Sequence, residues 1–191
     1  KVPSWENGKL GIHKITNSGN VIPNKWTDVR SGLSNSSNIV TTKIYQQMKD
    51  TYHMADKLES YMHKMGFGSD VITTEEYQGV YYSLPIGGIT KGTTVLDQTD
   101  GFSTLANKGN YTESYVIDKI ENADAEVIYQ HKAEAVEVFT DETAYLTTDI
   151  LRDVMDTGTA KDIEGQLNFT ADIAGKTGTS DGQKDIWFIG Y

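Results

Sequence analysis

Ala174-Gly175-Lys176-Thr177-Gly178-Thr179-Ser180 is the stretch that decides the fold, and the apolar run Ile186-Trp187-Phe188-Ile189-Gly190-Tyr191 follows it closely. The pattern predicts an edge strand and the strand beside it, because the two glycines remove side-chain bulk and let another backbone approach. Such an edge can accept a peptide as an additional strand. Lys176 adds a positive charge for a carboxylate, and Thr177 and Thr179 add hydroxyl donors for the same oxygens. The stretch therefore predicts a site for the C-terminus of a peptide.

The composition predicts one domain or a large part of one. The 191 residues are 37% hydrophobic and 10% aromatic, which is enough to bury a core. The formal net charge of -10 argues against nucleic acid as a partner, because polyanion binding needs a basic face. The chain has no cysteine, so disulfides, thiolate zinc sites and cysteine nucleophiles are excluded.

No apolar stretch approaches the ~20 residues of a membrane-spanning helix. The first residues, Lys1-Val2-Pro3-Ser4, lack the apolar region of a signal peptide. We therefore expect any membrane anchor to lie outside this chain. The four histidines are too scattered for a metal set, since His53 and His63 fall on different helix faces and the other two are remote in sequence. We expect neither a metal site nor a cofactor.

Hydrophobic spacing and end signals predict helices at residues 39–48, 54–65, 94–108 and 142–156. Strands are expected near residues 115–138, as a hairpin followed by a third short strand, and near residues 173–191. Residues 1–35 are rich in Gly, Asn, Ser and Pro, which predicts loops with one short strand at most.

Two of these helices carry clear end signals and apolar stripes. Thr94 and Asp97 have the spacing of a capping box, Gly109 marks the end of the same helix, and Thr140 or Asp141 caps the last one. The residues expected to face the core in the third helix are Val95, Phe102, Leu105 and Ala106. Those expected to do so in the last helix are Tyr145, Ile150, Leu151, Val154 and Met155.

A polar cluster, Ser34-Asn35-Ser36-Ser37-Asn38, lies immediately before the first of these helices. It contains the triplet Ser36-Ser37-Asn38, whereas the other Ser-x-Asn triplet, Ser18-Gly19-Asn20, lies in turn-rich sequence with no helix after it. Ser and Asn are preferred helix N-caps, so the cluster alone indicates capping rather than catalysis. Its position ahead of a Lys-Thr-Gly run is what favours a functional site.

In these two motifs the sequence resembles the transpeptidase domain of penicillin-binding proteins, whose signature is Ser-x-x-Lys, then Ser-x-Asn, then Lys-Thr-Gly. Three further segments resemble landmarks of that family: residues 102–109, its helix ending in Ala-Asn-Gly-Gly; residues 154–160, its Gly-Thr-Ala turn; and residues 185–191, the strand after Lys-Thr-Gly. The resemblance spans Trp26 to Tyr191. It is greatest to the bifunctional class A enzymes of Gram-positive bacteria, in which a glycosyltransferase domain comes first.

The resemblance implies acyl transfer. A serine attacks the D-Ala-D-Ala amide, releases D-alanine and passes the acyl group to an amine of a neighbouring stem peptide, or to water in a carboxypeptidase. Peptidoglycan stem peptides and β-lactams are the implied ligands, and proteins of cell division or elongation are further partners that the family allows. The implied location is the extracytoplasmic face of the bacterial cell membrane.

Carried over to this sequence, the family's roles fall on five residues. Ser36 would relay a proton between the active-site lysines and the leaving amine, and Asn38 would hold the substrate's acyl-side amide and the lysine of the first motif. Lys176 would supply positive potential. Thr177 and Thr179 would bind the terminal carboxylate, and the backbone N–H of Thr179 would provide half of the oxyanion hole.

One part of the signature is missing. No Ser-x-x-Lys occurs, since Ser60 and Ser180 are each followed by lysine four places on. We expect residues 1–191 to be part of one transpeptidase domain, inactive alone, with the nucleophile, a glycosyltransferase domain and an anchor supplied by the rest of a longer parent. Gly178 would keep the strand edge open for the substrate backbone.

The resemblance implies an α/β (α+β) fold in which helices cover an antiparallel sheet and a mostly helical subdomain faces the Lys176 strand. Three alternatives stay open: a non-catalytic member of the family that binds peptides as a sensor or scaffold, a serine β-lactamase, and an unrelated acidic α/β domain with two coincidental motifs. The β-lactamase is disfavoured because the chain has no convincing glutamate loop for deacylation.

Overall fold

The computed structural model describes residues 2–6, 9–13, 15–17, 26–71 and 83–191. The α-helices are α1 (Val29–Ser34), α2 (Asn38–Gln46), α3 (Ala55–Lys64), α5 (Val95–Ala106) and α6 (Asp141–Asp156). A π-helical turn, η1 (Gln47–Thr51), continues α2, and the shorter 3-10 turns are η2 (Leu84–Ile86), η3 (Glu164–Gln166) and η4 (Asp181–Gln183).

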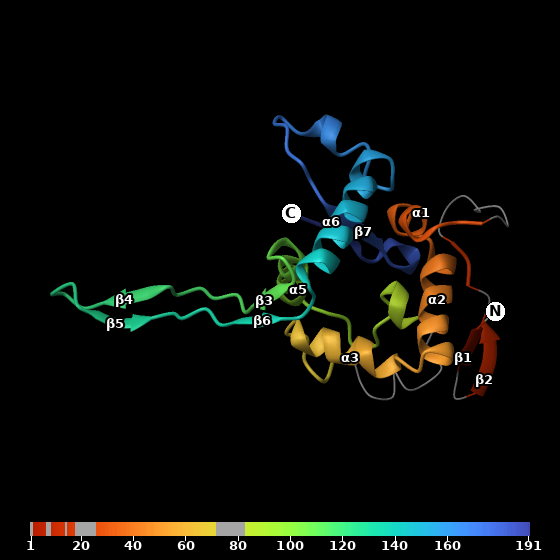
Figure 1. The fold of residues 1–191 in the computed structure, drawn as a ribbon, viewed down its shortest axis with the longest axis horizontal. Coiled ribbons are helices and arrows are strands. Elements are labelled where there is room, and N and C mark those ends of the chain that lie inside the picture. The colour runs from red at the N-terminus through yellow and green to blue at the C-terminus, as the bar shows by residue number, and fades with distance from the viewer. Residues whose placement is uncertain (1, 7–8, 14, 18–25, 72–82) are drawn as a thin grey trace.

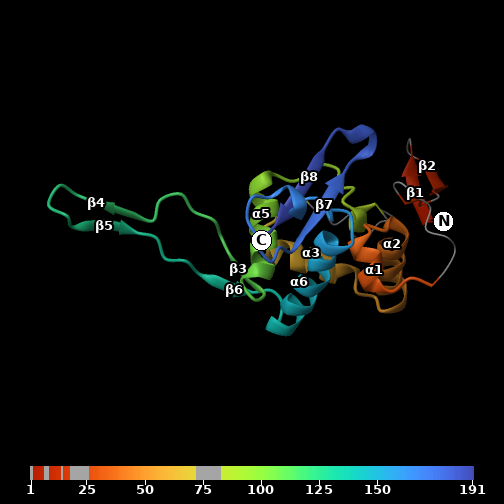
Figure 2. The same ribbon diagram turned by 90° about the horizontal axis from the view of Figure 1, so that it is seen from above.

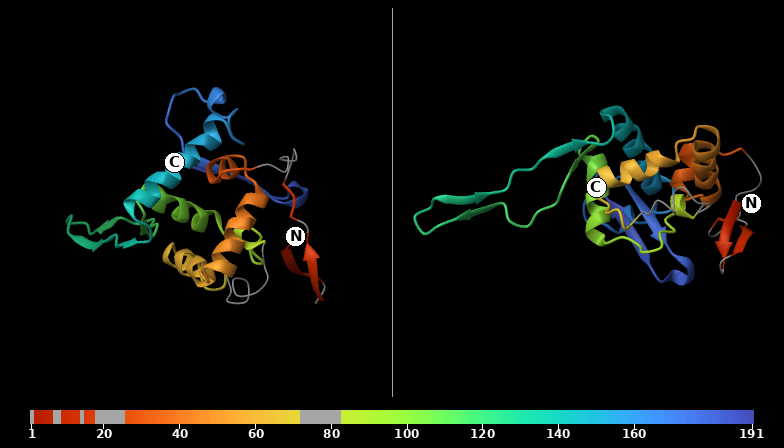
Figure 3. Two further views of the ribbon diagram at one scale, coloured as in Figure 1. Left: turned by 45° about the vertical axis from the view of Figure 1, so that its right-hand side comes forward. Right: turned by 90° about the horizontal axis from the view of Figure 1, so that it is seen from below.

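The strands pair as small antiparallel sheets. They are β1 (Val2–Glu6), β2 (Lys9–His13), β3 (Asn110–Thr112), β4 (Lys119–Glu121), β5 (Val127–Gln130), β6 (Ala135–Glu137), β7 (Gly175–Thr179) and β8 (Ile186–Gly190). Among the described residues they form the two-stranded pairs β1-β2, β3-β6, β4-β5 and β7-β8. The hairpin of β4 and β5 projects from one side of a helical body, and β1 and β2 lie at its other end (Figures 1 and 3). The mixed fold with antiparallel strands confirms the expected fold class.

All four predicted helices are present as α2, α3, α5 and α6, with ends that differ by a few residues from those expected. The prediction for residues 1–35 was wrong, because this segment contains β1, β2 and α1. Proline and glycine interrupt the alternating pattern of β1 and β2, so their pairing leaves a weak sequence signal. Helix α1 is only six residues long and includes Ser31, Gly32 and Ser34, so it depends on tertiary contacts rather than helix propensity.

The predicted helix ends are confirmed. Thr94 Oγ1 accepts from the N–H of Asp97 at 3.1 Å, and the Asp97 carboxylate accepts from the N–H of Thr94 at 2.9 Å, which completes the capping box. Thr140, not Asp141, caps α6. Gly109 takes a left-handed φ of +87°, where a Cβ would collide with the carbonyl of the chain leading into α6.

The predicted apolar stripes are right at some positions and wrong at others. Leu151, Val154 and Met155 of α6 are buried as expected, but Tyr145 is 69% exposed. In α5, Val95 is 65% exposed and Ala106 is exposed, because both ends of this helix extend past the core. Gly101 and Thr104 are instead its buried residues.

One hydrophobic cluster holds together the segments that carry the predicted site. It consists of Leu151, Val154 and Met155 of α6, Ala160 after α6, and Ala174 directly before β7. Leu33 of α1 and Tyr191 after β8 pack against it. Figure 2 shows the resulting arrangement, with α1 and the β7-β8 pair beside α6. Since burying each large aliphatic side chain contributes about 1.5–3 kcal/mol, this cluster fixes α1 relative to β7.

Candidate active site

The structure brings together two predicted site residues that are 140 positions apart in the chain. The ammonium group of Lys176 donates to Ser36 Oγ at 2.9 Å and to the Thr177 carbonyl at 2.7 Å. Burial lowers the pKa of Lys176 below that of an ordinary lysine, because the charged form loses solvation. A cation at this distance favours oxygen-centred negative charge on Ser36 and can exchange a proton with it.

The connection between α1 and α2, residues 35–37, forms a corner of the chain that positions Ser36 and is named the Ser36 corner. Its backbone takes a left-handed φ of +52°, which turns the chain sharply after α1. Ser37 is buried and caps α2, since its Oγ accepts from the N–H of Val40 at 3.3 Å. Capping therefore accounts for Ser37, whereas the Ser36 hydroxyl is directed to Lys176. The other Ser-x-Asn triplet, Ser18-Gly19-Asn20, lies outside the described residues.

Asn38 is the first residue of α2, two positions after Ser36. Its side-chain amide donates to the carbonyl of Thr16 at 3.0 Å. In the described part of the chain no donor contacts its Oδ1, so that oxygen is free to accept a hydrogen bond. The neighbouring Asn17 holds the same corner, because its Oδ1 accepts from Ser37 Oγ at 3.3 Å and from the N–H of Ile39 at 3.1 Å.

Strand β7 presents one unpaired edge. The amides of Ala174 and Ser180, at the two ends of the strand, donate to carbonyls on the β8 side at 2.9 and 3.0 Å. Hydrogen bonding alternates along an antiparallel strand, so the N–H groups of Thr177 and Thr179 point to the opposite edge. Within the described residues no strand pairs with that edge. It can therefore receive an extended peptide, with the Thr179 N–H available to an oxyanion.

The two glycines of β7 have different surroundings. A Cβ at Gly175 would lie 2.7 Å from both the Ile189 carbonyl oxygen and the ring of Phe188, so packing against β8 requires glycine there. A Cβ at Gly178 would meet only Trp187 Cβ, at an ordinary 3.6 Å. The fold does not require Gly178, and its role in admitting a substrate stays a prediction.

The hydroxyl of Thr177 is also engaged. Its Oγ1 lies 2.6 Å from Oγ1 of Thr159, in the turn after α6. The N–H of Thr159 donates to the carbonyl of Ser34 at 3.2 Å, so this turn contacts both the Ser36 corner and the Lys176 strand.

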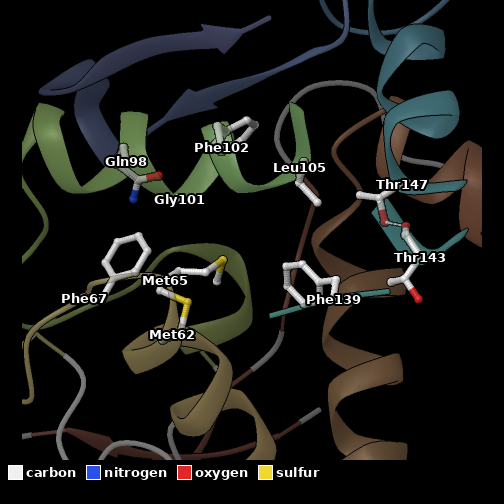
Figure 4. A pocket seen from close by; sticks show the side chains of 10 residues that line it. All are labelled: Met62, Met65, Phe67, Gln98, Gly101, Phe102, Leu105, Phe139, Thr143 and Thr147. Atoms are coloured by element: carbon white, nitrogen blue, oxygen red, sulfur yellow. Dashed lines mark hydrogen bonds between the residues drawn. The ribbon is translucent and has the colours of Figure 1, made fainter. Parts of the chain in front are cut away.

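An apolar cavity of about 280 Å³ lies elsewhere, between α3, α5 and α6 (Figure 4). Its lining residues are Met62, Met65, Phe67, Gln98, Gly101, Phe102, Leu105, Phe139, Thr143 and Thr147. None of them is a predicted site residue, and none carries a charge. The cavity suits an apolar group and does not supply the cation that a peptide carboxylate needs.

The described residues contain neither a metal site nor a membrane-spanning helix. In that part of the chain no three His, Cys, Asp or Glu side chains are grouped so that they could hold a metal ion. The helices in these segments also lack the combined length and hydrophobicity needed to cross a bilayer.

Sequence reasoning missed Thr16, Asn17 and Thr159 as neighbours of the site. The first two lie in turn-rich sequence that gives no signal for a contact with α2. Thr159 belongs to the Gly-Thr-Ala segment that resembles a family landmark, but the residues alone did not show that it contacts Thr177.

The chain is similar to known proteins in sequence and in fold. The family model described as "Penicillin binding protein transpeptidase domain" matches residues 2–191. Penicillin-binding protein 1F of Bacillus subtilis is 37% identical over 115 residues, covering 57% of this chain and 16% of the relative. Penicillin-binding protein 1A of Neisseria meningitidis is 32% identical over 171 residues, covering 87% of this chain and 20% of the relative. The chain thus spans a fifth or less of the length of these two relatives.

Solved structures show the same fold. Penicillin-binding protein 1A from Haemophilus influenzae superimposes with a TM-score of 0.77 at 20% identity, covering 100% of this chain and 32% of that one. Penicillin-binding protein A from M. tuberculosis, solved as an imipenem acyl-enzyme complex, superimposes with a TM-score of 0.75 at 18% identity, covering 91% of this chain and 41% of that one. Together with the family match over residues 2–191, these findings show that the chain belongs to the penicillin-binding protein transpeptidase domain family.

Proposed function

We propose that this chain forms the part of a D-Ala-D-Ala transpeptidase that binds the peptide terminus and relays protons, in a protein that cross-links peptidoglycan stem peptides. The observation that carries the proposal is the contact of the partly buried Lys176 ammonium with Ser36 Oγ, at the unpaired edge of β7. A cation, a serine hydroxyl and free backbone donors at one strand edge match the needs of acyl transfer to and from a peptide with a C-terminal carboxylate.

In this proposal each group has one task. The substrate backbone lies along β7, with its terminal carboxylate held by the hydroxyls of Thr177 and Thr179 and attracted by Lys176. The N–H of Thr179 donates to the oxyanion that forms on the attacked carbonyl, a type of interaction worth ~3 kcal/mol of barrier. Ser36 returns a proton to the leaving D-alanine amine, and Asn38 Oδ1 accepts from the acyl-side amide.

The nucleophile is proposed to lie outside these residues, because no Ser-x-x-Lys occurs among them. We expect the chain alone not to be acylated by β-lactams, and the protein from the complete gene to be acylated. The names penicillin-binding protein 1A and 1F among the relatives support a class A parent with a glycosyltransferase domain. The proposed place of action is the extracytoplasmic face of the bacterial membrane.

The proposal is tested on the protein from the complete gene. Fluorescent penicillin measures the rate of acylation, and intact-mass spectrometry counts the covalently bound penicillin. One covalently bound penicillin per protein is expected, and Lys176→Met should slow acylation strongly. Lys184→Met is the matched control, because Lys184 is an exposed lysine on the turn between the same two strands. Equal acylation rates of Lys176→Met and Lys184→Met would contradict the assigned role.

The same experiment separates the alternatives. A non-catalytic peptide-binding member of the family would give no covalent adduct. A serine β-lactamase would form the adduct and then release hydrolysed penicillin rapidly. A slowly decaying adduct is the result expected for a transpeptidase.

A further inference from the structure

We propose that Thr159 is a positioning residue that holds the Thr177 hydroxyl as a hydrogen-bond donor, and so sets the preference of the site for a ligand with a free carboxylate. This inference rests on the proposed function, in which Thr177 binds that carboxylate. It adds a residue from outside the two sequence motifs and assigns it a task.

The contact itself is short and well supported. Thr159 Oγ1 and Thr177 Oγ1 are 2.6 Å apart, at the short end of the range for two hydroxyls. The backbone around Thr159 is fixed on both sides, since its own N–H donates to the Ser34 carbonyl and the N–H of Ala160 donates to the Val154 carbonyl at 2.9 Å. Ala160 is buried in the main hydrophobic cluster. The hydroxyl of Thr159 is therefore presented by a rigid turn.

The chemistry of the ligand decides which hydroxyl donates. Each hydroxyl has a single proton to donate, and an ionised carboxylate can only accept. When Thr177 donates its proton to a carboxylate, its bond with Thr159 requires Thr159 as the donor. In the described part of the chain Thr159 Oγ1 has no other hydrogen-bond partner, so its proton is available for this purpose. If Thr177 donated its proton to Thr159 instead, only lone pairs of Thr177 Oγ1 would face the carboxylate, and the two groups would repel each other.

Thr157 provides a matched comparison within the same turn. Its Oγ1 donates to the carbonyl of Asp153 at 3.3 Å, inside its own helix end, and the residue is exposed like Thr159. Replacing either threonine by valine keeps the branched shape and removes one hydroxyl. Only the change at Thr159 removes a contact to Thr177.

The test compares two β-lactams with the protein from its complete gene: fluorescent penicillin with a free carboxylate, and its methyl ester. Second-order acylation rate constants are measured for the unmodified protein, Thr159→Val, Thr159→Ser and Thr157→Val. We expect Thr159→Val to acylate about fivefold more slowly with the acid, the size of one lost hydrogen bond between neutral groups, and at an unchanged rate with the ester. Thr159→Ser should restore the preference for the acid, and Thr157→Val should behave like the unmodified protein.

The outcomes distinguish the two proposals. If Thr159→Val reacts with both ligands as fast as the unmodified protein, Thr159 does not position Thr177, and the proposed function stands. If both ligands slow equally in Thr159→Val, the residue has only a structural role and the inference is overturned. If the unmodified protein is acylated by neither ligand, the proposed function fails and the inference fails with it.

Discussion

Substituting alanine at Gly158 is the sharpest perturbation of the site that the structure offers, although Gly158 belongs to neither motif. The residue is buried in the turn after α6, next to Thr159. A Cβ there would lie 2.8 Å from the Cα of Val154, 2.9 Å from the carbonyl oxygen of Asp153, and closer still to the carbonyl oxygen of Ser34. All three are backbone atoms, so no flexible side chain can move aside.

The expected loss of stability follows from these contacts. Forcing one methyl group into a well-packed region costs about 1–3 kcal/mol. Moving the Ser34 carbonyl also breaks its hydrogen bond from Thr159, which adds about 1 kcal/mol. We therefore expect Gly158→Ala to lower the free energy of unfolding by about 2–4 kcal/mol. Because Ser34 is two residues from Ser36, the variant should also lose acylation under conditions in which it remains folded.

Chemical denaturation of the protein from the complete gene measures the first effect, and fluorescent penicillin labelling measures the second. Gly165→Ala is the matched control, since a Cβ at Gly165 meets nothing within 4 Å and the residue is exposed. We expect this control to change the stability by less than about 0.5 kcal/mol. If Gly158→Ala is as stable and as reactive as Gly165→Ala, the turn does not join the Ser36 corner to β7 and the reasoning is refuted.

Three further predictions concern other parts of the site. Gly178→Ala should change the free energy of unfolding by less than about 0.5 kcal/mol, because its Cβ meets only Trp187. The same substitution should slow penicillin labelling at least about tenfold, because it obstructs the strand edge. Normal labelling would show that the ligand does not lie along this edge. Asn17→Ala should destabilise the protein by about 1–3 kcal/mol in denaturant titration, because it leaves the N–H of Ile39 without its acceptor, whereas the exposed Asn168→Ala should not. Burial lowers the pKa of Lys176 in the folded protein. Between this lowered pKa and about pH 10.4, the pKa of an ordinary lysine, the unfolded chain binds more protons than the folded one. In this range the free energy of unfolding should therefore rise with pH more steeply in the unmodified protein than in Lys176→Met. Parallel stability curves for these two proteins across the alkaline range would contradict the partial burial of this ammonium.

The sequence predicted the local parts of this structure better than its long-range contacts. The capping box at Thr94 and the strand pair β7-β8 follow from short-range rules, and both are present. The contact of Ser36 with Lys176 could be anticipated only through the family resemblance, because no local pattern joins residues 140 positions apart. The role of Thr159 could not be anticipated, since it depends on where the end of α6 meets β7.

The errors of the sequence predictions also concern long-range packing. Val95 fits the apolar spacing of α5 but lies in its first turn, beyond the part of the helix that the core covers. Tyr145 follows the buried Ala144, so this turn of α6 faces the core through Ala144 and Tyr145 lies on another face of the helix. Helix α1 was missed because Ser31, Gly32 and Ser34 disfavour a helix by propensity. In the structure α1 packs against α6 through Leu33, and its Arg30 side chain pairs with Asp149 and Asp153 of α6.

The most direct test of the central claim is the release of D-alanine from a stem peptide that ends in D-Ala-D-Ala, with an acceptor amine present. The protein from the complete gene should release D-alanine and join the shortened peptide to the acceptor. Lys176→Met should do neither at a comparable rate, and a peptide ending in L-Ala-L-Ala should not react. Penicillin binding without any release of D-alanine from the D-Ala-D-Ala peptide would contradict the claim that Ser36 and Lys176 serve a transpeptidase.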